Sequence, residues 1–167
     1  TLRGAFSLFG STSVASVYSN SMTISSGLAV DTARATNAAA FRVMGNIALQ
    51  NRSVLQFIGN SIVASGAGVS LISIAASVTL NGAAALAANS NQFQVSGFLR
   101  CVHVARGTAI DVNTSMQFNN NIVQRAEADQ NPRDTALELT FETISLLNGA
   151  TLTVSDNFLS ANYSYTT

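Results

Sequence analysis

The chain has 167 residues, of which 47% are apolar and only 10% are charged. Since an average soluble domain is roughly 25% charged, hydroxyl and amide side chains, glycans or neighbouring subunits must cover much of this surface. Eight Arg balance eight Asp and Glu, and there is no Lys. This balance supplies no basic surface for nucleic acid and argues against a nucleic-acid partner.

A degenerate repeat that ends in Asn runs through the sequence. Each copy places apolar residues two apart and an Asn three residues after the second, and this alternation is typical of a β-strand. A weaker copy at residues 6–11 ends in Ser. The clear copies are residues 41–46, 55–60, 86–91, 116–121 and 152–157.

Two other kinds of short strand are predicted between these copies. One kind leads through Asn-Gly into the next copy, at residues 78–83 and 144–150. One unit is therefore a strand, a turn, a strand that ends at Asn-Gly, a strand that ends at Asn, and a short apolar tail. The first strands of the units are residues 28–31, 69–72, 110–113 and 137–140.

Runs of alanine predict one or two brief helices at most, because Ala is a poor strand residue. These runs are residues 38–40 and 83–85, and Asp31 or Thr32 is a candidate cap for a helix that leads to the first.

Two longer segments have a distinctive composition. Residues 62–80 are uncharged and long enough to span a bilayer, but their Ser and Gly content favours buried strands. Residues 124–135 concentrate charge and hold the single proline, which predicts an exposed loop.

The recurrence of whole units favours a right-handed parallel β-helix with about four to five rungs. The alternative is a β-sandwich in which Asn-Gly makes hairpins between antiparallel strands. A sandwich does not require each strand to resemble one a full unit away, whereas a solenoid does. We expect residues 1–167 to form a single β-helix domain with little helix. Neither end resembles a polar cap, so we expect a fragment of a longer protein or a subunit that stacks on others.

The repeated Asn predicts a ladder of stacked side chains. Its amide can donate and accept along the stack, and Asn tolerates the left-handed backbone of tight corners. Most steps between these residues are 30 to 36 long and one is 14, which suggests an inserted or skipped piece. The ladder candidates are Asn46, Asn60, Asn91, Asn121 and Asn157.

Three sequons are candidates for N-glycosylation, at Asn51, Asn113 and Asn162. Together with the low charge, they predict a location outside the cell or at the cell surface. Cys101 is the only cysteine, so no internal disulfide can form.

Residues 55–62 (Leu-x-Phe-x-Gly-Asn-Ser-Ile) and 147–150 (Leu-Asn-Gly-Ala) resemble the repeats of the dispersed-gene-family surface proteins of kinetoplastids. The repeats of that family are predicted to form a pectin-lyase-like β-helix. The resemblance covers about residues 41–160 and implies an extracellular or membrane-attached glycoprotein with an adhesive or coat role. The single Cys101 departs from the family, whose chains carry more cysteine.

Pectin-lyase-like folds also host polysaccharide hydrolases and lyases, and glycoside hydrolysis needs two carboxylates in a fixed geometry. The sequence has no Asp-Asp pair and none of the Gly-His-Gly or Arg-x-Lys elements of polygalacturonases, so we assign no catalytic residue. A carbohydrate-active enzyme stays an alternative, with Asp111 and Asp156 as the first acids to replace. The acids in or beside predicted strands are Asp31, Asp111, Asp156, Glu138 and Glu142.

Metal binding has weak candidates only. Cys101 and His103 are two apart on a predicted strand, but zinc needs three or four ligands. Glu127, Asp129 and Asp134 form an acidic loop that matches no known calcium repeat. We therefore predict no metal and no cofactor.

The function that the sequence favours is a structural or adhesive extracellular surface protein that acts through an extended solenoid face. Its partners would be carbohydrate or a host or neighbouring surface protein, together with further repeats or subunits stacked on it. A third hypothesis is a filament or fibre subunit whose open ends pair between chains.

Overall fold

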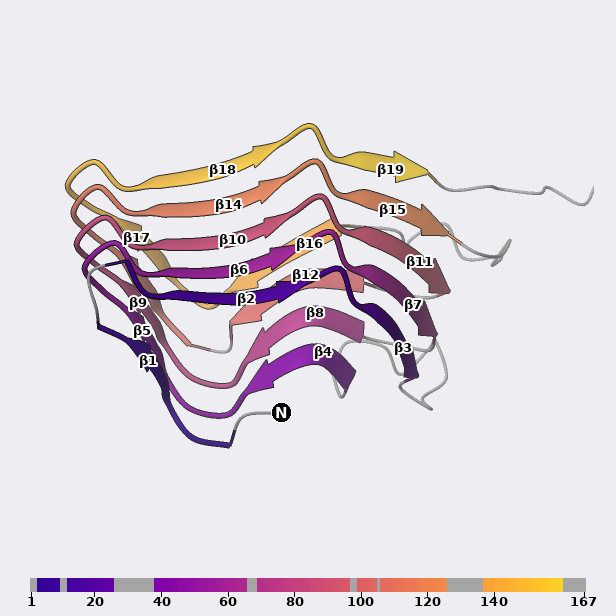
Figure 1. Ribbon diagram of the computed structural model, residues 1–167, viewed down its shortest axis with the longest axis horizontal. Helices are drawn as coiled ribbons and strands as arrows, with labels where there is room; N and C mark the ends of the chain where they lie inside the picture. The colour runs from indigo at the N-terminus through magenta and orange to yellow at the C-terminus, as the bar shows by residue number, and fades with distance from the viewer. Residues whose placement is uncertain are drawn as a thin grey trace, which may run out of the picture.

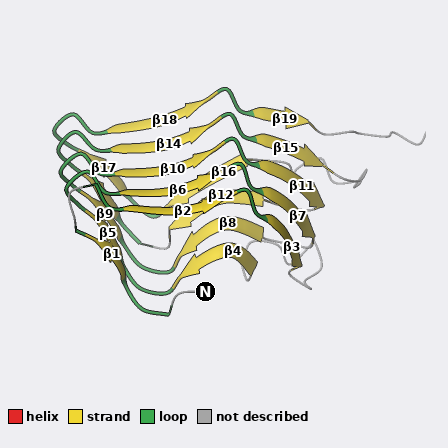
Figure 2. Cartoon of the chain, viewed as in Figure 1, coloured by secondary structure: helices red, strands yellow, loops and turns green. Residues whose placement is uncertain are grey.

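In the computed structural model, the residues described are 3–9, 12–25, 38–65, 69–96, 99–104, 106–125 and 137–160. Within these ranges the chain forms strands β1 to β19 and no helix (Figures 1 and 2). Every pairing between the described strands is parallel. The protein is thus an all-β structure built from parallel sheets.

The strands form four sheets, each of which takes every fourth strand. The first sheet contains β1 (Phe6–Leu8), β5 (Ile47–Leu49), β9 (Val78–Leu80), β13 (Thr108–Ile110) and β17 (Ile144–Leu146). The second contains β2 (Val14–Tyr18), β6 (Val54–Ile58), β10 (Ala85–Asn89), β14 (Ser115–Asn119) and β18 (Thr151–Ser155). The third contains β3 (Ser21–Ser25), β7 (Ser61–Ser65), β11 (Gln92–Ser96), β15 (Ile122–Arg125) and β19 (Phe158–Ser160). The fourth contains β4 (Ala38–Val43), β8 (Val69–Ile74), β12 (Leu99–Val104) and β16 (Leu137–Phe141).

We call a set of consecutive strands, one from each sheet, a layer. The first described layer is β1 to β3, and the last is β16 to β19. Antiparallel hairpins are absent among the described strands, so the hairpins of the sandwich alternative are wrong. Asn81-Gly82 and Asn148-Gly149 instead form turns that lead from the first sheet to the second within one layer.

Alternation along each strand separates an inner face from an outer one. In β6, Leu55 and Phe57 are buried whereas Val54, Gln56 and Ile58 are only half-buried. Side chains at such inner positions on all four sheets belong to one hydrophobic core. Because parallel strands lie only about 4.8 Å apart, the inner side chains of adjacent layers pack directly on each other.

Within the described residues, neither alanine run forms one of the brief helices considered for it. Residues 38–40 open β4, and Ala85 opens β10 after a turn in which Ala83 has a φ of 61°. In β10, pairing with β6 and β14 overrides the poor strand propensity of Ala, and β4 pairs with β8. The short tail predicted after each Asn is itself a strand. After Asn60, Asn91, Asn121 and Asn157 it belongs to the third sheet, and after Asn46 it is β5 of the first sheet.

The sequence also predicted a strand at 110–113, a loop at 124–135 and a possible membrane span at 62–80. The strand predicted at 110–113 ends at Ile110, because Val112 and Asn113 take left-handed φ values of 46° and 56° and turn the chain. Most of the predicted loop at 124–135, and the strand and helix cap predicted around residues 28–32, lie outside the described residues. Residues 62–80 contribute to β7, β8 and β9, and no described helix is long and apolar enough to cross a membrane.

Candidate functional site

A column of asparagines runs through the layers at the corner between the second and third sheets. Each member lies between two strands of its layer, as Asn60 does between β6 and β7. The three central side chains are no more than 1% exposed. We call this set the asparagine column: Asn20, Asn60, Asn91, Asn121 and Asn157.

Asn91 shows how each column amide is satisfied. Its Oδ1 accepts hydrogen bonds from the backbone N–H of Asn60 at 3.1 Å and from the Asn60 Nδ2 at 2.9 Å. Its Nδ2 donates to the Oδ1 of Asn121 at 3.0 Å and to the carbonyl oxygen of Phe57 at 3.1 Å. All four hydrogen-bonding positions of the amide are therefore used, which removes the cost of burying it.

The left-handed backbone at this corner belongs to the residue before each column Asn, not to the Asn itself as the sequence suggested. Such φ values are costly for most side chains but accessible to Gly, Asn and Asp. This requirement accounts for the Gly-Asn, Asn-Asn and Asp-Asn pairs in the sequence. The residues concerned are Ser19 (φ 52°), Gly59 (65°), Ser90 (57°), Asn120 (56°) and Asp156 (54°).

Asn46 is not part of the column, so its prediction as a ladder member is wrong. It lies between β4 and β5, at a corner whose next member is Ser77, and its exposed side chain accepts one bond from the Ser77 backbone N–H at 3.2 Å. With no Asn in the next layer, its amide has nothing equivalent to stack on.

Asn20 is the column member that the sequence reading missed. Its Nδ2 donates to the Oδ1 of Asn60 at 3.1 Å. The sequence does contain the repeat at this point, because Ala15, Val17 and Asn20 have the same spacing as Leu55, Phe57 and Asn60. With Asn46 excluded and Asn20 included, a step of 40 from Asn20 to Asn60 replaces the irregular step of 14.

Two predicted glycosylation sites lie on the described surface. Asn51 and Asn113 are both exposed, and they occupy turns between the first and second sheets in two different layers. The Nδ2 of Asn51 donates to the carbonyl oxygen of Phe9 at 3.2 Å. Asn162 lies outside the described residues.

The carboxylates proposed for catalysis do not come together. Asp111 precedes β14, whereas Asp156 follows β18, so they lie at opposite ends of the second sheet. A five-residue strand rises about 17 Å, more than the spacing of a glycosidase pair. Asp111 instead accepts bonds from the backbone N–H of Val112 at 2.8 Å and from the Asn148 Nδ2 at 2.6 Å.

The other residues considered for metal binding or catalysis do not form a cluster within the described residues. Cys101 and His103 lie in β12, and Glu142 is exposed after β16. No cluster of three or more His, Cys, Asp or Glu occurs within the part of the chain described. Asp31, Glu127, Asp129 and Asp134 lie outside that part, and Glu138 falls in β16.

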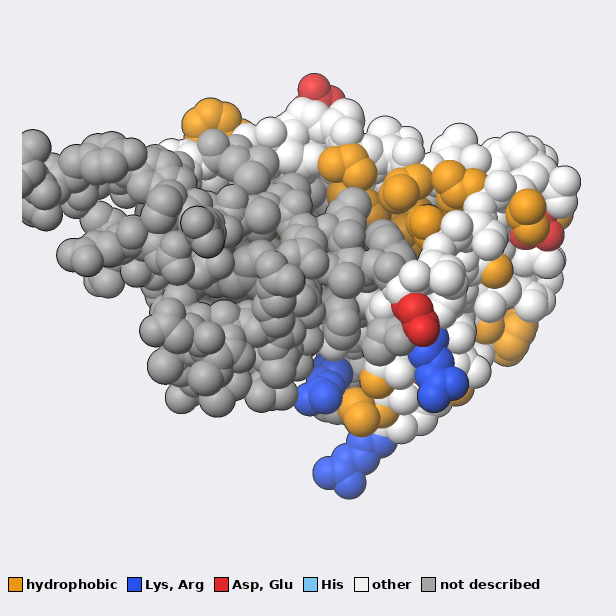
Figure 3. Space-filling model, turned by 180° about the vertical axis from the view of Figure 1, so that it is seen from behind, with side chains coloured by type: hydrophobic (Ala, Val, Ile, Leu, Met, Phe, Trp, Pro, Cys, Tyr) orange, Lys and Arg blue, Asp and Glu red, His pale blue; other side chains and the backbone are white. Residues whose placement is uncertain are grey.

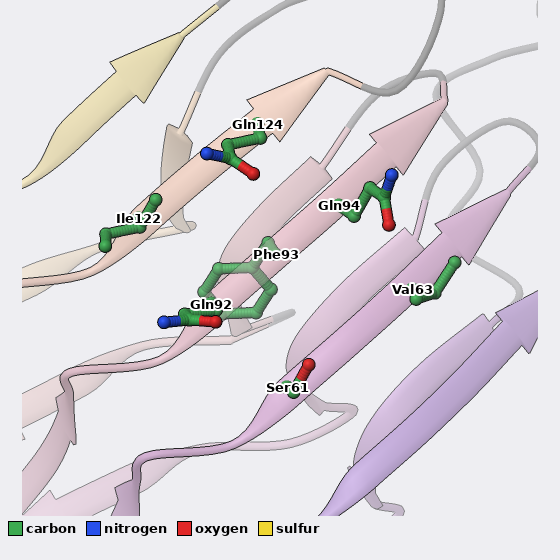
Figure 4. Close-up of a pocket in the computed structure, with 7 residues that line it drawn as sticks. All are labelled: Ser61, Val63, Gln92, Phe93, Gln94, Ile122 and Gln124. Atoms are coloured by element: carbon green, nitrogen blue, oxygen red, sulfur yellow. The ribbon is translucent and has the colours of Figure 1, made fainter.

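A groove of about 170 Å³ lies on the outer face of the third sheet, across β7, β11 and β15 (Figure 4). The exposed amides of Gln92, Gln94 and Gln124 stand along it, whereas the ring of Phe93 belongs to the core at 1% exposure. None of its lining residues is charged. We call this the glutamine groove, lined by Ser61, Val63, Gln92, Phe93, Gln94, Ile122 and Gln124.

The chain matches no protein-family model, and no curated protein or solved structure is significantly similar to it. The resemblance to the kinetoplastid surface proteins stays a prediction.

Proposed function

We propose that the chain is a right-handed parallel β-helix that works as a structural and adhesive protein outside the cell. The pairing of every fourth strand supports the fold, since one continuous winding would produce that order. The asparagine column supports it too, because a buried ladder needs equivalent corners in successive turns. An experimental structure with left-handed winding would contradict this assignment.

The extracellular location rests on the exposed sequons. Asn51 and Asn113 lie in turns that accept a bulky substituent without disturbing the core. Native protein treated with an N-glycosidase is expected to lose mass at one or both positions. Native protein that carries no glycan at any sequon would count against this location.

The glutamine groove is the observation that carries the adhesive role, and its chemistry favours a neutral carbohydrate. Amide and hydroxyl groups can both donate to and accept from sugar hydroxyls. The side chains of Val63 and Ile122 offer apolar contact for the C–H faces of a sugar ring. A charged polysaccharide would find no counter-charge among these lining residues.

Gln94→Ala is expected to weaken binding of neutral oligosaccharides by about threefold to tenfold, because one hydrogen bond of about 0.5–1.5 kcal/mol is lost. Calorimetry with glucose-, galactose- and mannose-based oligosaccharides measures the change. The matched control is Gln117→Ala, since Gln117 lies on the second sheet outside the groove. Equal effects of the two variants, or no binding of any neutral oligosaccharide at millimolar concentration, would refute the adhesive role.

A further inference from the structure

The last layer exposes side chains at positions that are buried in the layer beneath it. Ile144 and Leu146 in β17 are 38% and 46% exposed, whereas their register partners Thr108 and Ile110 in β13 are 2% and 0% exposed. Val154 is 52% exposed, and its partner Phe118 is fully buried. Viewed from behind, hydrophobic side chains gather toward the upper part of the described surface, where this layer lies (Figure 3).

The same end of the stack also presents unused hydrogen-bond donors. In the layer below, Asn121 donates from its backbone N–H and its Nδ2 to the Oδ1 of Asn157, at 3.0 and 2.9 Å. The corresponding groups of Asn157 have no such acceptor among the described residues, and its Nδ2 makes one bond, to the carbonyl oxygen of Phe118 at 2.8 Å. The edges of β16 to β19 likewise have no further strand beside them within the described chain.

The opposite end presents the complementary group. The Oδ1 of Asn20 has no donor among the described residues, although every other column Oδ1 accepts two bonds. Inner side chains of this first layer are only half-buried, among them Ala15, Val17 and Met22. One end of the column therefore offers donors and the other an acceptor, each surrounded by apolar side chains.

We propose that a second copy of this chain stacks head to tail on the last layer, an inference that rests on the proposed β-helix. Strands β17, β18 and β19 of one copy would pair with β1, β2 and β3 of the next, which continues three of the four sheets. Asn157 would donate to Asn20 of that copy, so the asparagine column would run on. Because such a contact joins two different surfaces and need not close, it would build a filament.

Two variants that each block one end test this arrangement. Val154→Arg places an uncompensated charge on the last layer, and Ala15→Arg places one on the first, at positions that already face an open end. Each of these two variants is expected to lower the self-association constant by at least about a hundredfold, because an unmatched charge in an interface costs several kcal/mol. Thr79→Arg is the control, because Thr79 is exposed on the outer face of β9, the central strand of the first sheet, and lies outside the glutamine groove.

Sedimentation velocity from micromolar to millimolar concentration, with circular dichroism to verify folding, gives the readout. The unaltered chain and Thr79→Arg are expected to form growing oligomers, and Val154→Arg and Ala15→Arg are each expected to be monomeric alone. An equimolar mixture of these two is expected to give dimers only, since one free end of each type remains. A monomeric unaltered chain, or dimers of Ala15→Arg alone, would overturn the proposal. Since glycan binding is measured separately, the adhesive role can stand or fall independently of this result.

Discussion

Asn91→Ala is expected to lower the free energy of unfolding by about 3–5 kcal/mol, because it removes four buried hydrogen bonds of about 0.5–1.5 kcal/mol each. The backbone N–H of Asn60 loses its acceptor, the Asn60 Nδ2 keeps only its bond to the carbonyl oxygen of Val17, and the carbonyl oxygen of Phe57 loses one donor. It also removes one of the two donors to the Oδ1 of Asn121. Because Asn91 is fully buried, water cannot readily replace these bonds.

Asn46→Ala is the matched control for this variant. The same chemical group is removed, and the sequence places Asn46 in the same repeat pattern, yet its side chain is exposed and accepts a single bond. A loss of no more than about 1 kcal/mol is expected there. Urea unfolding of both variants measures the difference. Equal losses of unfolding free energy in the two variants would mean that a buried column Asn stabilises the protein no more than an exposed Asn does.

The contrast between Asn46 and Asn91 shows what the local sequence can and cannot specify. Phe41, Val43 and Asn46 have the same spacing as Leu55, Phe57 and Asn60, because both corners follow a strand with inward alternation. Column membership depends instead on which residue occupies the same corner in the adjacent layer. That neighbour is about 30 or more residues away, and turn lengths that vary between layers hide the correspondence.

The parallel strands and most of their positions could be predicted because the inner side chains repeat at two-residue spacing in every layer. The alanine runs could not be assigned, since Ala85 and Ala88 are held in β10 by neighbours on both sides and not by their own propensity. The glutamine groove was also missed. Its amides come from β11 and β15 and are separated by about 30 residues in sequence, so only the register of the third sheet brings them together.

Phe118→Ala is expected to cost about 3–5 kcal/mol of unfolding free energy, the usual range for removing a fully buried aromatic side chain. Phe118 is fully buried on the inner face of β14. At the corresponding inner position of the layer beneath, β10 supplies only Ala88, which pairs in register with Phe57 of β6. A small residue between two aromatic ones lets the rings fit within the narrow strand spacing, and Ala88 is too small to fill the space that the variant leaves.

Phe158→Ala is the control, because it deletes the same ring from a position that is 59% exposed at the start of β19. Its expected cost is within about 0.5 kcal/mol, as for most surface substitutions. Urea unfolding at a concentration where the chain is monomeric separates the two variants. If both lost little stability, the interior would be loosely packed and the layers would be held chiefly by backbone pairing. If only Phe118→Ala unfolds early, the stack depends on its buried aromatic side chains as well as on backbone pairing.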